Sequence, residues 1–164
     1  MIKFIATASI VLLVSWHALA AGPMTVEQIQ QVMDAADAAA VRRDTQGIGS
    51  HLSERFEKTV AVPYQGGTAA TKLGKREYLD LIDKGWADME AYSYQREDTV
   101  INVAADGRSG ESSSTITETV VIDGETRISK VREYAQFALE DGKPVITSIG
   151  GHTLVGDTMP DADP

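Results

Sequence analysis

The chain has 164 residues, no cysteine and a formal net charge of −9, with 43% hydrophobic and 24% charged residues. This composition is typical of a globular domain and excludes a scaffold held together by disulfides. The acidic balance argues against binding to nucleic acid or to an anionic membrane surface, because both need clustered Lys and Arg. Stability must come from a buried hydrophobic core, and the length suits a single domain.

The first 21 residues have the pattern of a secretory signal peptide. A short positive start precedes the apolar run 4–16, and Ala18-Leu19-Ala20 supplies the small-x-small pattern of a cleavage site. The apolar run is shorter than the roughly 20 residues that a membrane span needs, so no span is expected after cleavage. We expect cleavage after Ala20 or Ala21 and a periplasmic or secreted protein.

Helical periodicity recurs in the N-terminal half of the remaining chain. Thr25 and Gln28 form a capping-box pattern, and the apolar residues that follow recur every three or four positions. This pattern predicts a long helix that ends near Asp44. A short helix is predicted over 45–53 and a third helix over 75–89.

The segments between these helices carry weaker signals. Residues 56–62 alternate and predict a short strand that Pro63 stops, whereas the Gly- and Thr-rich segment 65–74 predicts a loop. At the other end of the chain, 156–164 is acidic, contains two prolines and is predicted to be disordered. One domain is therefore expected over 22–155.

Segment 91–154 predicts four long strands joined by Asp-Gly turns at 106–107, 123–124 and 141–142. The stretches between the turns are longer than an ordinary strand of about 5 to 6 residues, so the sheet must twist and curve. Alternation gives the sheet one apolar face, on which we expect the helices to pack, and one polar face rich in threonine. The apolar face is predicted to carry Ile116, Val120, Ile122, Val131, Ala135, Phe137 and Leu139.

This order of elements resembles the cone-shaped superfamily of nuclear transport factor 2, which includes the ketosteroid isomerases and the SnoaL-like proteins. The resemblance covers nearly the whole mature chain. It implies an α+β fold in which three N-terminal helices pack on a strongly curved antiparallel sheet. The stretches that carry it are Asp44-Thr45-Gln46-Gly47-Ile48, Leu52-Ser53-Glu54-Arg55-Phe56, Lys75-Arg76-Glu77-Tyr78-Leu79 before Gly85-Trp86, and 134–149 with Gly142-Lys143-Pro144.

The family's catalytic residues are not at the matching positions of this sequence. Aligned on Asp44, the tyrosine of the isomerases falls on or near Ala36, and their carboxylate base falls near Val60 or Ala61. None of these side chains transfers a proton, and the His and Asp of the dehydratases have no counterparts at matching places. The resemblance therefore implies a non-catalytic branch, and we expect no cofactor.

Some residues are nevertheless candidates for a site. Asp34 and Asp37 lie one turn apart on the first helix and would be candidate general bases inside a cone, although the simpler interpretation is that both face water. His51 and His152 have no third ligand at a metal-site spacing, so we expect no metal. A tyrosine offers an apolar ring with a hydrogen-bonding tip, which suits a pocket. The predicted pocket residues are Tyr64, Tyr92, Tyr94 and His152.

Two functions stay open. The first is a secreted, non-catalytic module that binds a small apolar ligand in the cone or a partner protein, such as an immunity protein of the cell envelope. The second is an isomerase, dehydratase or cyclase that uses a carboxylate and a tyrosine in the cone. A carboxylate or histidine in the cavity within hydrogen-bond reach of a tyrosine would favour the enzyme, and an apolar or filled cone would exclude it.

A protein interface is expected on the polar face of the sheet. Threonine and tyrosine fit a pleated surface and can be buried when their hydroxyls are paired. We expect this face to form a homodimer or to bind another envelope protein. The predicted interface residues are Thr115, Thr117, Thr119, Lys130, Arg132, Tyr134 and Gln136.

Overall fold

The computed structural model describes residues 22–64 and 67–155, without the side chains of 61–68. The predicted signal peptide over 1–21 and the predicted acidic tail over 156–164 lie outside the described residues. The elements are α1 (Val26–Val41), α2 (Thr45–Gly49), β1 (Leu52–Tyr64), β2 (Gly67–Gly74), α3 (Lys75–Ala87), β3 (Ala91–Val103), β4 (Ser109–Ile122), β5 (Glu125–Glu140) and β6 (Lys143–Val155).

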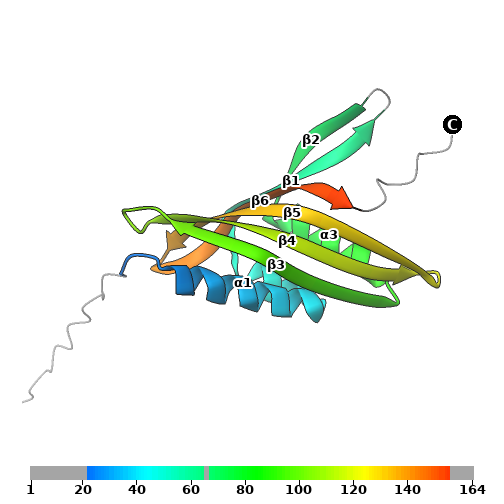
Figure 1. Ribbon diagram of the computed structural model, residues 1–164, viewed down its shortest axis with the longest axis horizontal. Coiled ribbons are helices and arrows are strands. Elements are labelled where there is room, and N and C mark those ends of the chain that lie inside the picture. The colour runs from blue at the N-terminus through cyan, green and yellow to red at the C-terminus, as the bar shows by residue number, and fades with distance from the viewer. Residues whose placement is uncertain (1–21, 65–66, 156–164) are drawn as a thin grey trace, which may run out of the picture.

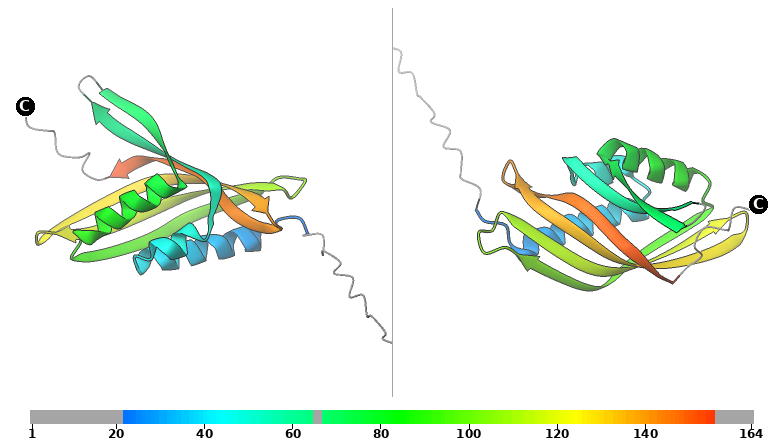
Figure 2. Two further views of the ribbon diagram at one scale, coloured as in Figure 1. Left: turned by 180° about the vertical axis from the view of Figure 1, so that it is seen from behind. Right: turned by 90° about the horizontal axis from the view of Figure 1, so that it is seen from above.

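The strands form one curved sheet in the order β2-β1-β6-β5-β4-β3. The α+β architecture with helices on a curved sheet is confirmed, and α1 and α3 lie on the same side of the sheet (Figures 1 and 2). The sheet is antiparallel except where β1 pairs in parallel with β6. Strand β1 therefore lies between its sequence neighbour β2 and the last strand, β6.

The long strands and their turns agree with the sequence analysis. Strands β3 to β6 span 13, 14, 16 and 13 residues. Asp123-Gly124 and Asp141-Gly142 have positive φ at both positions, as a tight turn of the mirror-image type requires. In the turn after β3 only Gly107 has positive φ, and a Cβ there would collide with Pro23. Only glycine suits that position, because the N-terminal segment packs against the turn.

Segment 65–74 was predicted to be a loop, and this was wrong: from Gly67 onward it forms β2. Its register with β1 runs from Glu57 opposite Gly74 to Tyr64 opposite Gly67. The β1–β2 hairpin projects from the body of the molecule (Figure 1). A hairpin away from the core has no buried side and therefore no apolar alternation to reveal it.

Other predicted boundaries also need correction. Strand β1 runs through Pro63 to Tyr64, so Pro63 does not stop it as predicted. The second helix ends at Gly49 and not at residue 53, because β1 already begins at Leu52, four residues before the predicted strand. Leu52 is buried and pairs with Ile146 of β6, so burial and sheet pairing override the helical spacing seen in the sequence. The third helix ends at Ala87, two residues earlier than predicted.

The core lies between the helices and the concave face of the sheet. Ile29 and Met33 of α1, Phe56 of β1 and Phe137 of β5 are each at most 2% exposed. The predicted capping box of α1 is present: the Thr25 N–H donates to Gln28 Oε1 at 2.9 Å, and the Gln28 N–H donates to Thr25 Oγ1 at 3.3 Å. Among the described helices, none is long and apolar enough to cross a membrane.

Trp86 attaches α3 to the rest of the core. Its side chain is 9% exposed, and its ring lies 5.8 Å from that of Tyr92 in an edge-on arrangement. Trp86 is thus part of the buried core. The same helix exposes Leu81, which is 52% accessible.

We predict that Trp86→Ala lowers the free energy of unfolding by about 3 to 5 kcal/mol, the usual cost of truncating a large buried aromatic side chain. Leu81→Ala on the same helix is the matched control and should cost less than about 1 kcal/mol, because Leu81 is exposed. Chemical denaturation followed by circular dichroism measures both values. Equal effects of the two substitutions would contradict the packing of α3 described above.

Candidate functional site: a polar cavity inside the cone

A cavity of about 260 Å³ lies between α1, α3 and the concave face of the sheet. Ligand pockets usually enclose about 300 to 1,000 Å³, so this one suits a compact molecule. Most of its wall is apolar and comes from residues far apart in the sequence. This apolar wall includes Met33 and Ala36 of α1, Ile82 and Trp86 of α3, Ile116 of β4 and Phe137 of β5.

A β-bulge in β3 decides which of its side chains face the cavity. Before the bulge, Tyr92, Tyr94 and Arg96 point inward; after it, Ile101 and Val103 pack on the core. The bulge interrupts the pairing with β4 between Glu97 and Val100, and Asp98 has φ of +50° there. One extra residue shifts the alternation, so even-numbered positions face inward before it and odd-numbered positions after it.

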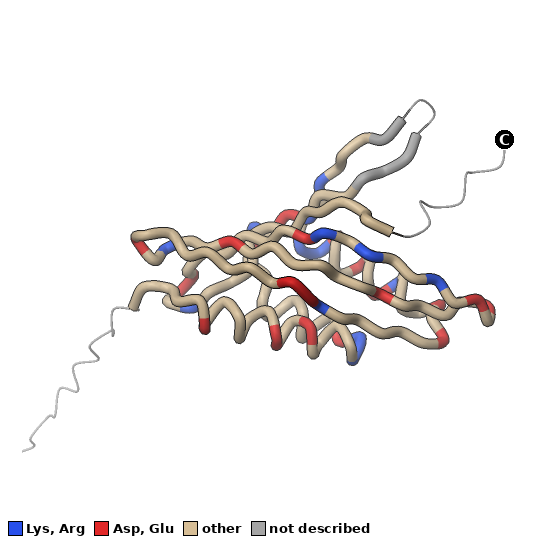
Figure 3. The backbone as a smooth tube through the Cα atoms, in the orientation of Figure 1, with Lys and Arg blue, Asp and Glu red and all other residues tan. Residues whose placement is uncertain are grey.

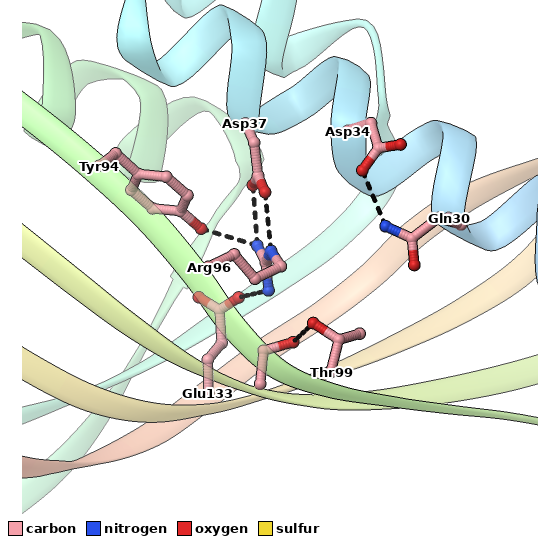
Figure 4. Close-up of polar contacts among 8 residues, drawn as sticks. Gln30, Asp34, Asp37, Tyr94, Arg96, Thr99 and Glu133 are labelled. Atoms are coloured by element: carbon pink, nitrogen blue, oxygen red, sulfur yellow. Dashed lines mark hydrogen bonds and ion pairs between the residues drawn. The ribbon is translucent and has the colours of Figure 1, made fainter.

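Arg96 is the centre of a polar network at the cavity wall (Figure 4). Its Nε and Nη2 donate to the two carboxylate oxygens of Asp37 on α1, at 2.8 and 2.9 Å. Nη1 donates to Glu133 Oε1 of β5 at 3.1 Å. Nη2 also donates to the Tyr94 hydroxyl at 2.7 Å. One side chain thereby joins α1 to two strands of the sheet.

The network is largely withdrawn from water. The side chains of Arg96, Asp37 and Glu133 are 13%, 21% and 15% exposed. Burial by itself lowers the pKa of Arg96, but the hydrogen bonds to Asp37 and the charge of Glu133 more than compensate and raise that pKa above its ordinary value. Lys58 adds a second cation, with its Nζ 3.8 Å from Glu133 Oε2.

Glu118 of β4 is a further polar residue of the cavity and is not part of the Arg96 network. Its Oε1 accepts a hydrogen bond from the Tyr92 hydroxyl at 2.7 Å. Within the described part of the chain, Glu118 has no Lys or Arg nitrogen within the 4.0 Å of an ion pair. The cone is therefore neither filled nor purely apolar, and it holds a carboxylate in direct contact with a tyrosine.

The tyrosines of the cavity stay protonated at neutral pH. Burial raises the pKa of Tyr94, and the negative charge of Glu133 raises it further. Burial also raises the pKa of Tyr92, and the charge of Glu118 adds to the shift. Tyr78 of α3 behaves in the same way, with burial as the main cause. A phenolate is thus disfavoured at all three positions.

The two aspartates that were singled out in the first helix have different surroundings. Asp37 lines the cavity and binds Arg96. Asp34 is exposed and accepts a hydrogen bond from Gln30 Nε2 at 2.8 Å (Figure 4). The expectation that both face water therefore does not hold for Asp37. The reason is that Asp37 has a cationic partner 59 residues away in the sequence.

The predicted pocket residues are only partly brought together. Tyr92 and Tyr94 line the cavity, whereas the side chain of Tyr64 lies outside the described residues. His152 does not line the cavity: it is exposed, and its ring lies 6.1 Å from that of Tyr134. His152 lies opposite Arg132 of β5 in the strand register, and Arg132 is one of the residues predicted on the outer face of the sheet.

The predicted interface residues follow the outer face of the sheet. Thr115 is only 4% exposed, and its Oγ1 accepts a hydrogen bond from Arg132 Nη1 at 2.9 Å. Tyr134 is 49% exposed, and Gln136 is also exposed. The remaining candidates are partly accessible, namely Thr117, Thr119, Lys130 and Arg132.

Four charged residues of the cavity were not predicted from the sequence: Lys58, Arg96, Glu118 and Glu133. The sequence does contain a signal for the two glutamates, Glu118 and Glu133. Glu118 lies between two inward positions of β4, and Glu133 lies between Val131 and Ala135, both inward on β5. A charged residue at an inward position of an alternating strand indicates a polar site, because an unpaired buried charge is costly. Among the described residues, no group of three or more potential ligands is placed to hold a metal ion.

No family model matches the sequence, and no curated protein matches it. Solved structures are similar to it in shape. A protein from Novosphingobium aromaticivorans, proposed to be a scytalone dehydratase, has a TM-score of 0.67 at 12% identity over 80% of this chain and 85% of its own. A type 3 hexachlorocyclohexane dehydrochlorinase from Novosphingobium barchaimii has 0.65 at 13% identity, over 80% and 87%.

An uncharacterised protein with a cystatin-like fold from Caulobacter vibrioides has a TM-score of 0.64 at 10% identity, over 79% of this chain and 89% of its own. Identities this low show the fold alone. The chain has the cone-shaped fold of the nuclear transport factor 2-like proteins, and the resemblance noted in its sequence is confirmed at that level.

Alkaline titration tests the environment of the cavity tyrosines. Because the pKa values of Tyr78, Tyr92 and Tyr94 are raised in the folded state, three of the five tyrosines should stay protonated as the pH passes 10. Their contribution to stability is complete below pH 10 and is lost as the pH rises further, because only the unfolded state then releases these protons. Tyrosinate absorbance of native and denatured protein measures the difference.

Tyr94→Phe is the matched variant for this titration. It should leave two protected tyrosines and should reduce the loss of unfolding free energy above pH 10. Five tyrosines that ionise together near pH 10 in the folded protein would contradict the burial of the cavity.

Proposed function

We propose that this protein is an exported, non-catalytic binding module that holds a small molecule inside its cone. The observation that supports this most directly is the cavity of about 260 Å³, whose wall is mostly apolar with a few polar groups of fixed position. Walls of that kind are typical of small-molecule sites, in which apolar contact supplies affinity and a few polar groups orient the ligand.

The bonds around Arg96 occupy two of the three cavity carboxylates, and at those two residues they support binding more than turnover. Asp37 and Glu133 are both engaged with Arg96, which leaves neither carboxylate free to accept a proton from a ligand. A general base needs an accessible oxygen within hydrogen-bond reach of the proton that it removes. The fixed ion pairs instead hold α1 at a constant distance from the sheet and keep the cavity open.

An enzyme of the isomerase, dehydratase or cyclase type is a second proposal, and one observation favours it. Glu118 accepts a hydrogen bond from Tyr92 at 2.7 Å inside the cavity, which is the carboxylate–tyrosine contact that such an enzyme would need. One of the solved structures of similar fold is named as a dehydrochlorinase, and another is proposed to be a dehydratase. Recovery of bound compounds in altered form, lost in Glu118→Gln, would establish this second function.

A substitution that fills the cavity tests the binding proposal. Ala36 lines the cavity, so Ala36→Phe should occupy it and abolish binding of small fragments, whereas Ala38→Phe on the exposed side of α1 should leave binding unchanged. Ligand-detected NMR with a library of compact fragments measures both variants. Fragments that bind the wild type and Ala36→Phe equally well would contradict a site in the cone, as would a library without a single binder.

Export and a protein interface are further parts of the proposal. The signal-peptide pattern supports export, and a first residue other than Ala21 or Gly22 in the exported protein would contradict it. The outer face of the sheet supports a homodimer or a complex with another envelope protein, as a protective partner would form. Val100, Ile128 and Tyr134 are 49 to 55% exposed on strands of this sheet, and Lys and Arg residues are spaced along β5 (Figure 3).

We predict that Thr117→Glu combined with Tyr134→Glu dissociates this assembly without unfolding the protein. Lys130 lies opposite Thr117 in the register, so a glutamate at position 117 has a cationic neighbour in the monomer. Light scattering after size exclusion measures the mass. Gln31→Glu combined with Ala38→Glu on the exposed side of α1 makes the same change of charge and should have no effect. A wild-type protein that is monomeric at high concentration and binds nothing through this face would contradict the interface.

A further inference from the structure

The formal charges that line the cavity do not balance. Three carboxylates face it, from Asp37, Glu118 and Glu133, against two cations, from Lys58 and Arg96. Charges inside a low-dielectric cavity interact more strongly than charges in water, so an excess of one sign selects the charge of the ligand. The cavity is thus unfavourable for an anion.

The excess negative charge resides on Glu118. Arg96 bridges Asp37 and Glu133 with three hydrogen bonds, and Lys58 lies 3.8 Å from Glu133. These two carboxylates are therefore already neutralised. Glu118 accepts a hydrogen bond only from the neutral Tyr92 hydroxyl among the bonds of the described residues, and no described cation lies within ion-pair distance of it.

Aromatic side chains line the same cavity as this carboxylate. Tyr92 reaches it through the hydroxyl, and the Trp86 ring lies 5.8 Å from the Tyr92 ring. Tyr78, Trp86 and Tyr92 all line the cavity. Rings attract cations through their faces, and Trp does so most strongly.

We propose that the cone binds a compact organic cation, with a protonated amine that donates a hydrogen bond to Glu118 beside Trp86 and Tyr92. The apolar body of this amine fills the space against Met33, Ile116 and Phe137. This inference rests on the proposed function and specifies its ligand class. An ammonium compensates the free carboxylate and restores neutrality to the cavity, which a neutral ligand of the same shape does not do.

The size of the cavity limits the body of the amine to about one ring. An engineered protein cavity of roughly 150 Å³ holds one benzene molecule, and the cavity here is about 260 Å³. A ring with a one-carbon amine arm is therefore a suitable probe. Benzylamine, benzyl alcohol and benzoate have nearly the same shape and differ in charge, so their comparison isolates the effect of charge.

The experiment measures the affinity of these three probes for the full chain by calorimetry and ligand-detected NMR at neutral pH. Benzylamine should bind, benzyl alcohol should bind at least about tenfold more weakly, and benzoate should not bind detectably. Glu118→Gln keeps an acceptor for the Tyr92 hydroxyl while it removes the charge. It should weaken benzylamine binding about 10- to 100-fold and should leave benzyl alcohol binding unchanged.

Asp34→Asn is the matched control, because it removes the same charge from an exposed position on α1 outside the cavity. It should leave the affinity for benzylamine unchanged. Equal binding of benzylamine and benzyl alcohol by the wild type would overturn the inference without the use of any variant, and so would a Glu118→Gln protein that binds benzylamine normally. In both cases fragment binding that Ala36→Phe abolishes would still support the small-molecule site.

Failure of all three probes, with other fragments bound in the cone, would overturn the inference of an amine and leave the proposed function intact. Failure of all three probes together with the whole fragment library would overturn both.

Discussion

The ion pair between Arg96 and Asp37 is the interaction on which the rest of the cone depends. Its two hydrogen bonds cross from α1 to β3, and a third bond from the same guanidinium reaches Glu133 on β5. Removing one partner of such a pair leaves an uncompensated buried charge, which costs about 3 to 5 kcal/mol in typical cases. The helix is therefore held at a fixed height above the sheet, and the space beneath it does not collapse onto the apolar wall.

The curvature of the sheet forms the wall of the cavity opposite the helices. Strands of 13 to 16 residues must twist and bend, and the β-bulge in β3 adds a local change of direction. The bulge also lets one strand contribute polar residues before it and apolar residues after it to the same concave side. Backbone geometry thus separates the polar end of the cone from the apolar end that the N-terminal segment covers.

Much of the fold was predictable because its signals are local. The Asp-Gly turns need only two adjacent residues, and the capping box of α1 needs four. The cavity network was less predictable, because its bonds join residues 59 and 37 positions apart. The sequence of strand β2 shows no alternation of apolar and polar residues that would predict a strand. The bulge at Asp98 shifts the alternation of β3, so no single period-two reading places both halves of that strand correctly.

The parallel pairing of β1 with β6 also affects how the chain folds. Leu52 pairs with Ile146, so the first strand has its inner neighbour only when the last strand is in place. Bringing Leu52 and Ile146 together closes a long loop of the chain, and the entropic cost of this closure must be met before the contacts stabilise the sheet. Domains rich in such distant contacts fold in roughly milliseconds to seconds, more slowly than helical bundles. Completion of this sheet therefore waits for β6, the last of its six strands along the chain.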